Sequence, residues 1–288
     1  MKFGIIFSNS GPAAEGDYAA EMARLAESAG IESLWAVEHV VVPAGYESTY
    51  PYSADGKMPG GEEFPIPDPL IWLSYVAAAT STIRLGTGIL ILPQRNPVIT
   101  AKEAATLDRL SGGRLDLGIG VGWLAEEFDA LGIPFDDRAA RTDDHVAAMR
   151  ALWTEEQASY TGSHSSFRNL ISLPKPAQES IPIHVGGHSI PSAKRAGRLG
   201  DGYFPAKGDN DRLAELFGAM RDAANDAGRN PDDIELTTGA RATPDEIKQL
   251  GEDLGVDRVV IPPLGFDLGS LRQGLERYAD EVIAKVNG

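Results

Sequence analysis

The chain has 288 residues, 42% of them hydrophobic, and a formal net charge of −16 at pH 7. It contains no cysteine, which excludes disulfide bonds, thiolate metal ligands and cysteine nucleophiles. The acidic balance argues against nucleic-acid binding, and no apolar run approaches membrane-spanning length. The five histidines lack metal-ligand spacing, and the sequence starts directly with a strand-like run. We therefore expect a cytoplasmic protein without a metal site.

The first half of the chain alternates short apolar runs with helical patterns. We expect strands at 2–8, 31–37, 83–92 and 114–120, and helices at 18–29, 70–80, from 97 to about 112, and over most of 126–153. Asp68-Pro69 and Asn96-Pro97 are typical of an N-cap followed by proline at the first helical position. Residues 42–68 show no periodicity but contain many prolines, glycines and tyrosines, which predicts a lid or binding loop.

The second half continues the alternation after an unusual segment. Residues 158–178 differ in composition from their surroundings and predict an inserted hairpin or extended loop. Strands are expected at 181–185, 201–204, 235–238 and 257–261, and helices at 189–199, 211–227, 243–254 and 268–286. Eight strands alternating with helices predict an α/β fold, a single (β/α)₈ TIM-barrel domain over 1–288 with a lid at about 42–68 and an insert at about 158–178.

A barrel of this kind places its active site at the carboxyl ends of the strands. Four glycine-rich or polar strand ends meet that condition: Glu38-His39, Thr87-Gly88-Ile89, Gly120-Val121-Gly122 and Gly186-Gly187-His188-Ser189. Glycines let a ligand approach the backbone closely, so their repetition at one face suits a large flat ligand.

The last of these strand ends has the pattern of a phosphate-binding site. A buried strand to Val185 leads through Gly186-Gly187 into a helix that Ser189 caps. The first amides of such a helix lack intrahelical partners and lie at the positive end of its dipole. The pattern therefore predicts a phosphate cradle, with an ordinary strand-to-helix loop as the alternative.

Motifs along nearly the whole chain resemble those of the bacterial luciferase-like flavin and deazaflavin oxidoreductases. They are Glu38-His39, the run Ile83 to Ile89, Leu92-Pro93, Arg95-Asn96-Pro97, Gly113-Arg114-Leu115, Leu117 to Gly120, Pro174-Lys175-Pro176, Gly186-Gly187 and Gly200-Asp201-Gly202. Their order and spacing are similar to those of the family, and in particular to an actinobacterial group of probable F420-dependent oxidoreductases.

The resemblance implies roles for individual residues. It implies a non-prolyl cis peptide at Gly88–Ile89, with the Ile89 side chain behind the cofactor ring. It implies that Ser189 and Ser192 bind the cofactor phosphate and that His39 faces the reactive ring edge, oriented by Glu38, which replaces the more usual Asp. The remaining expected cofactor-binding residues are Thr87, Gly120, Gly122, Val185, Gly186, Gly187 and His188.

Two positions depart from the pattern of some family members. Val121 stands where some FMN-using members have an arginine, which favours coenzyme F420 over FMN. Trp123 stands where the sugar-phosphate dehydrogenases have a catalytic glutamate, which argues against their activity. Because F420 has an acidic tail, Lys175, Lys194 and Arg195 are candidates for binding it, with solvated surface as the alternative.

Aromatic residues suggest where a substrate binds. Trp123, Tyr46 and Tyr50, together with Tyr52, are expected to line an apolar substrate pocket under the lid, or else to pack in the core and anchor the loop. Arg138 and Arg141 lie near Asp143 and Asp144 and are interpreted as a structural ion-pair network.

We therefore expect hydride transfer between F420 and a small organic substrate, with His39 and Glu38 as catalytic residues. Histidine suits this task because its usual pKa lies near neutrality, although a packing role at a strand end is the alternative. An FMN-dependent two-component monooxygenase supplied by a separate reductase is a second hypothesis. A cofactor-binding protein without turnover is a third. The resemblance also implies a homodimer.

Overall fold

A computed structural model describes residues 1–288, and it contains the predicted parallel barrel. The strands are β1 (Lys2–Ile6), β2 (Ser33–Ala36), β3 (Arg84–Thr87) with β4 (Leu90–Ile91), β5 (Leu115–Gly120), β8 (Ile183–Gly186), β9 (Gly202–Phe204), β10 (Glu235–Gly239) and β11 (Arg258–Ile261). They run in the order β3-β2-β1-β11-β10-β9-β8-β5-β4, and pairing of β3 with β5 closes the sheet. β3 and β4 together occupy one position in the barrel, so the barrel has the predicted eight strand positions.

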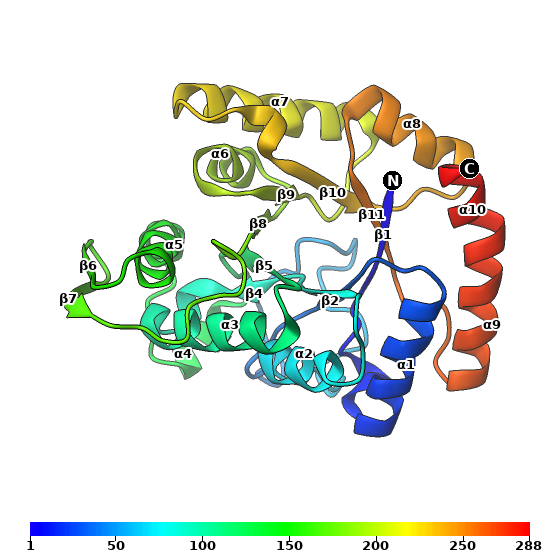
Figure 1. Cartoon of the computed structure of the whole chain (residues 1–288), viewed down its shortest axis with the longest axis horizontal. Coiled ribbons are helices and arrows are strands. Elements are labelled where there is room, and N and C mark those ends of the chain that lie inside the picture. Colours follow the sequence, from blue (N-terminus) through cyan, green and yellow to red (C-terminus); the bar gives the residue numbers. More distant parts are fainter.

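Helices surround the strands (Figure 1). They are α1 (Gly16–Ser28), α2 (Pro69–Ala77), α3 (Pro97–Ser111), α4 (Ala125–Ala130), α5 (Arg138–Thr154), α6 (Ile190–Leu199), α7 (Asn210–Asp226), α8 (Pro244–Leu254), α9 (Leu268–Tyr278) and α10 (Ala284–Asn287). The last predicted helix is not one continuous α-helix, because a π-helical turn at Ala279–Ile283 separates α9 from α10. None of the helices has the length and apolar character that crossing a bilayer requires.

Short polar side chains begin the helices as the sequence predicts. Asp68 accepts a hydrogen bond from the Ile71 amide, and Asn96 accepts from the first amides of α3. Thr243 and Glu246 form the expected capping box of α8. These caps satisfy amides that have no partner within the helix, so they define where each helix starts.

The third barrel strand is divided where the sequence places glycines. The cis peptide at Gly88–Ile89 lies between β3 and β4, as the resemblance implied. Beside it, the hydroxyl of Thr87 donates to the carbonyl oxygen of Gly118 at 2.6 Å. A Cβ at Gly118 would lie only 1.8 Å from the Thr87 carbonyl oxygen, so β3 and β5 approach this closely only because residue 118 is glycine.

Charged side chains fill the amino-terminal end of the barrel. The buried guanidinium of Arg258 donates to Glu32 at 2.9 and 3.0 Å and also to Glu235. Arg84 forms a similar bidentate pair with the buried Asp116. These charges are paired with one another, as burial requires. The amino-terminal end is therefore closed, and the hollow of the barrel opens at the carboxyl ends of the strands.

The two predicted insertions differ in structure. Residues 42–68 contain no helix or strand. Residues 158–178 contain an antiparallel hairpin, β6 (Ala158–Thr161) and β7 (Ser166–Leu170), which lies beside α5 at the edge of the molecule (Figure 1). One cluster of 51 buried residues joins the barrel to its helices. It supports the single-domain assignment, which stays a prediction.

Candidate active site

A cavity of about 1360 Å³ lies at the carboxyl ends of the barrel strands, under the lid. This volume exceeds the roughly 300–1,000 Å³ typical of a site for one drug-sized ligand. The predicted site residues that line it are Glu38, His39, Gly88, Ile89, Gly120, Gly122, Trp123, Val185, Gly186, Gly187, His188, Ser189, Ser192 and Tyr50. The barrel thus brings together residues that are far apart in the sequence.

Two predicted site residues do not line this cavity. Thr87 is fully buried, and its hydroxyl is bonded to Gly118 in the barrel wall. Tyr46 is also buried, and its hydroxyl accepts a hydrogen bond from the amide of Met58 within the lid. The prediction that Thr87 contacts the cofactor and that Tyr46 lines the substrate pocket is therefore wrong. Thr87 joins two strands, and Tyr46 anchors the loop.

His39 is held by a carboxylate that the sequence analysis did not single out. Nδ1 of His39 lies 3.1 Å from Oε2 of Glu127, which α4 carries and which is fully buried. The other oxygen of Glu127 accepts the amide of Val40 at 2.6 Å. Because a carboxylate accepts hydrogen bonds, Nδ1 carries the proton in neutral His39, and Nε2 is left as an acceptor.

Glu38 does not orient His39, contrary to expectation. Its buried carboxylate accepts from the amide of Ile91 and from the guanidinium of Arg95, at 2.8 Å from Nε. Burial raises the pKa of Glu38, against the opposing effect of Arg95. Arg95 also pairs with Asp68 at the start of α2. Glu38 therefore fastens β2 to the segment after β4, and a direct part in the reaction stays a prediction.

The Ile89 side chain forms part of the cavity floor between β5 and β8. A Cβ at Gly120 would lie 2.5 Å from Cδ1 of Ile89, and one at Gly186 would lie 2.5 Å from Cγ2. Both strands can accommodate Ile89 only because these residues are glycines. This explains the glycines by packing against the protein itself, and it leaves a smooth apolar surface at the cavity.

The predicted phosphate cradle has the expected local geometry. Ser189 caps α6, and Ser192 completes a capping box with it. Gly187 has φ +115°, and a Cβ there would lie 3.1 Å from Ser192, so the loop needs glycine. Both serines face the cavity beside the amino terminus of α6. The site is suited to an anion, and phosphate binding stays a prediction.

The cationic side chains that line the cavity are not all those that were expected. Lys175 donates to backbone carbonyl groups of residues 152 and 155, and neither it nor Lys194 lines the cavity. Arg195 lines it but is paired with Asp143 at 2.5 Å. The solvated-surface alternative therefore fits the exposed Lys194, whereas Lys175 is half-buried and bound to the backbone.

The interpretation of Arg138 as part of a structural ion-pair network is wrong. Arg141 does form an ion pair, but its partner is Asp137, at 2.7 Å, and not Asp143 or Asp144. Arg138 instead lines the cavity and donates to the carbonyl oxygens of Gly122 and Phe135, without any salt bridge. Burial lowers the pKa of Arg138, because the charge is partly desolvated. An anionic ligand group would supply the missing partner, whereas spacing alone could not distinguish the two arginines.

The lid crosses the cavity and contacts the β8 loop. Glu126 accepts from the amides of Glu47 and Ser48 at 2.7 and 3.0 Å and holds the first part of the lid on α4. Farther along, the Tyr52 ring packs on the His188 ring, with centroids 4.7 Å apart. Tyr50 lies against Trp123. Of the three lid tyrosines, Tyr50 and Tyr52 line the cavity, while Tyr46 has the anchoring role.

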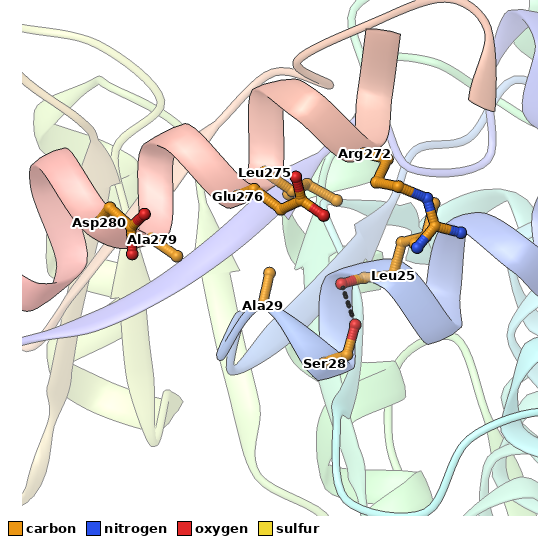
Figure 2. Close-up of a pocket in the computed structure, with 8 residues that line it drawn as sticks. All are labelled: Leu25, Ser28, Ala29, Arg272, Leu275, Glu276, Ala279 and Asp280. Carbon is orange, nitrogen blue, oxygen red and sulfur yellow. Dashed lines mark hydrogen bonds between the residues drawn. The ribbon is translucent and has the colours of Figure 1, made fainter. Parts of the chain in front are cut away.

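A smaller hollow of about 210 Å³ lies outside the barrel between α1 and α9 (Figure 2). Its floor is formed by apolar side chains such as Leu25 and Leu275. The hydroxyl of Ser28 is bonded to the Leu25 carbonyl oxygen, and Arg272 donates to Glu21. No predicted site residue lies there, so the candidate active site is the cavity under the lid.

Comparison with known proteins identifies the family. The model of the luciferase-like monooxygenase family matches residues 1–250. The chain belongs to the luciferase-like monooxygenase family. This membership confirms the predicted relationship and places the chain among oxidoreductases.

Individual relatives extend over most of the chain. An uncharacterised protein of Mycobacterium tuberculosis is 33% identical and covers 90% of this chain and 91% of its own. An F420-dependent glucose-6-phosphate dehydrogenase of Kineococcus radiotolerans is 33% identical, and the match covers 79% of this chain and 64% of that protein. The crystal structure of the monooxygenase RslO1 from Streptomyces bottropensis superposes with a TM-score of 0.76, at 26% identity and with 99% of both chains covered.

Proposed function

We propose that the protein transfers a hydride between coenzyme F420 and a small organic substrate. The observation that carries the proposal is His39 at the cavity wall, with Nδ1 held by the buried Glu127 and Nε2 without a hydrogen-bond partner. A neutral imidazole in this state can accept a proton at Nε2, which is what a general base requires. The proton from a substrate hydroxyl would pass to this atom.

The residues present fit a flat cofactor that bears a phosphate. Ile89, Gly120 and Gly186 form an apolar wall without projecting polar groups. Ser189 and Ser192 lie at the amino terminus of α6, and Arg138 provides a positive charge without a carboxylate partner. The apolar wall would contact the ring system, and the polar groups would bind the phosphate.

In the proposed reaction a bound cofactor would carry the hydride, and His39 would carry the proton. When bound, F420 accepts or donates the hydride. Oxidation of an alcohol would release a hydride from carbon, which a bound F420 would take up, and a proton from the hydroxyl group. The O–H proton moves to Nε2 of His39, and a C=O bond forms. In the reductive direction the same atoms move in reverse. The Trp123 ring packs edge-on to the His39 ring, with centroids 5.6 Å apart, and limits the movement of the imidazole.

Two observations favour F420 over FMN. A relative that covers most of this chain is named as F420-dependent. In addition, Val121 occupies the position at which some FMN-using members have an arginine. Trp123 replaces the glutamate that the resemblance associates with sugar-phosphate oxidation, so we propose a different substrate from that relative's.

The second candidate is an FMN-dependent monooxygenase that receives reduced flavin from a reductase. The family description and the similarity to the Streptomyces monooxygenase favour it. A protein that binds the cofactor without turnover is the third candidate. We propose a cytoplasmic homodimer in each case. Sedimentation equilibrium tests the oligomeric state directly.

Titration of the purified protein with F420 and, separately, with FMN distinguishes the candidates. Quenching of the fluorescence of the four tryptophans reports binding. We expect micromolar or tighter F420 binding and weaker FMN binding, and the reverse order would favour the monooxygenase. His39→Ala is expected to retain cofactor binding and lose turnover. An unaltered rate in this variant would remove His39 from the mechanism, and binding of neither cofactor would overturn the proposal.

A further inference from the structure

The cavity residues divide between two opposite sides of the barrel mouth. The residues proposed to hold the cofactor come from the segment between β3 and β4, from β5 and α5, and from β8 and the helix after it. Strands β1, β11 and β10 lie on the other side of the closed sheet and supply a different set of lining residues. His39 follows β2, which lies between the two sets. A molecule bound on the second side would therefore lie in the same cavity as His39.

This second side is apolar. We name it the apolar chamber, and its main residues are Ile6, Phe7, Met22, Phe64, Ile261 and Pro262. Met22 and Ile261 are buried in the protein core, and Phe64 belongs to the lid. The cavity exceeds the size of a single drug-sized site, so it has room for a substrate beside the cofactor.

None of the main residues of the apolar chamber is charged. Glu38 is the only carboxylate among all the residues that line the cavity, and it is paired with Arg95. Arg241, after β10, donates to the carbonyl oxygen of Gly208 and to Asn210. Lys207, after β9, lies over the Tyr52 ring, which packs on the β8 loop. A charged group lying among the main chamber residues would lose its hydration with no opposite charge among them.

The backbone of Phe7 directs a large apolar side chain into the chamber. Phe7 has φ +61°, which is a strained conformation for a bulky residue. The amide and hydroxyl of Ser10 both donate to the Phe7 carbonyl oxygen, at 3.2 and 2.8 Å, and hold this turn. Strained residues of this kind cluster at functional sites. The strain thus coincides with the cavity wall and not with a surface turn.

We infer that the apolar chamber binds the organic substrate and selects an uncharged, mostly apolar alcohol or carbonyl compound. The inference rests on the proposed function, because that proposal places the cofactor on the opposite side of the cavity. The Phe64 ring closes the chamber from the lid side, where it packs against Gly11 and Gly60. The apolar walls exclude water, and His39 supplies the polar group next to the reacting carbon.

A homologous series of neutral ketones tests the inference on the F420-loaded protein. We expect the dissociation constants of 2-butanone, 2-hexanone and 2-octanone to fall about fourfold for each added CH₂, from the transfer free energy of one methylene. Octanoate, similar in length but charged, is expected to bind at least about tenfold more weakly than 2-octanone, because none of the main chamber residues is charged. Glucose 6-phosphate is the second charged control. Equal affinities along the series, or tighter binding of either charged compound, would overturn the inference.

Two variants locate the ketone site. Ala240→Leu and Ala242→Leu each add side-chain volume at residues that follow β10 and line the cavity. We expect both to weaken 2-octanone binding about tenfold or more while F420 binding is retained, which also shows that the variants are folded. Unchanged ketone affinity in both variants would place the ligand elsewhere and overturn the inference alone. Failure of the wild-type protein to bind F420 or FMN would overturn the proposed function, and the substrate assignment with it.

Discussion

The buried carboxylate of Glu127 contacts His39 with one oxygen and the backbone with the other. Oε2 lies 3.1 Å from Nδ1 of His39, and Oε1 accepts from the amide of Val40 at 2.6 Å and that of Val41 at 3.3 Å. The two oxygens therefore have different tasks. The backbone contacts fix the carboxylate in place, and the remaining oxygen determines which imidazole nitrogen carries the proton.

Glu127→Gln is expected to reverse the tautomer of His39. The single oxygen of the new amide side chain would have to serve the amides of Val40 and Val41, so its NH₂ group would face Nδ1 of His39. Nδ1 would then act as the acceptor and Nε2 would carry the proton. Long-range ¹H–¹⁵N correlation spectra of the imidazole, assigned with His39→Ala, distinguish the two tautomers. Turnover is expected to fall about 10²-fold or more, as removal of a general base implies.

Glu126→Gln is the matched control, since Glu126 is adjacent in α4 and binds lid amides without contacting His39. It is expected to leave the His39 tautomer unchanged. If Glu127→Gln also left the tautomer unchanged, the proposed positioning role of Glu127 would be wrong. Loss of activity in both variants with unaltered spectra would indicate that the lid attachment matters and the tautomer does not.

Arg138→Met is expected to weaken cofactor binding about 10- to 100-fold, the usual cost of losing a hydrogen bond between charged groups. The weakening should shrink as salt concentration rises, because salt screens the wild-type interaction. Arg141→Met is the control, since Arg141 lies on the same helix but pairs with Asp137. Fluorescence titration with F420 measures both. Equal effects of the two variants would assign Arg138 a structural role.

Removing the Tyr52 ring is expected to free the lid from the β8 loop. Its packing on His188 joins the two across the cavity, and burial, with Lys207 and Arg212 nearby, lowers the pKa of His188, so the imidazole is neutral at pH 7. Tyr52→Ala should therefore speed cofactor dissociation several-fold with a smaller effect on association. Stopped-flow fluorescence measures both rates. Tyr52→Phe retains the ring and should behave as wild type, and a Phe variant as fast as the Ala variant would contradict the packing role.

Glu27 gives a prediction about stability and pH. Burial by itself would raise its pKa, but hydrogen bonds from the amides of Thr82, Ile83 and Ser81 lower it to about 2. A lowered pKa means that the carboxylate stabilises the folded state above its unfolded pKa of about 4.3, and that this contribution is lost as pH falls toward 2. Urea unfolding of wild type and Glu27→Gln is expected to differ most at pH 6–7, with a difference that shrinks below about pH 4 and disappears only near pH 2. A difference that stays constant with pH would exclude this carboxylate as its source.

Local patterns predicted much of the fold. Caps such as Asp68 and Asn96 lie within three residues of the amides that they bind, so sequence shows them directly. Alternation of apolar strands with amphipathic helices was enough to predict the barrel, because a parallel sheet requires a crossover between successive strands. The glycines near residues 88, 120 and 186 marked the strand ends at the cavity, since close backbone approach requires them.

The errors concern partners that lie far apart in the chain. Glu38 was expected to orient the adjacent His39, yet its carboxylate reaches Arg95, and Glu127 takes its place beside the imidazole. Arg138 and Arg141 look equivalent in sequence, but the turn of α5 directs one to the cavity and the other to Asp137. Lys175 likewise points to backbone carbonyl groups outside the cavity.

The sequence by itself therefore determined the family, the barrel and the strand ends that form the site, because these depend on periodicity, capping and glycine positions along the chain. Only the tertiary structure decided which charged groups pair, which aromatic residues face the cavity and which carboxylate holds His39. Those outcomes depend on distances between side chains that closure of the barrel creates, such as the contact between His39 and Glu127, 88 positions apart.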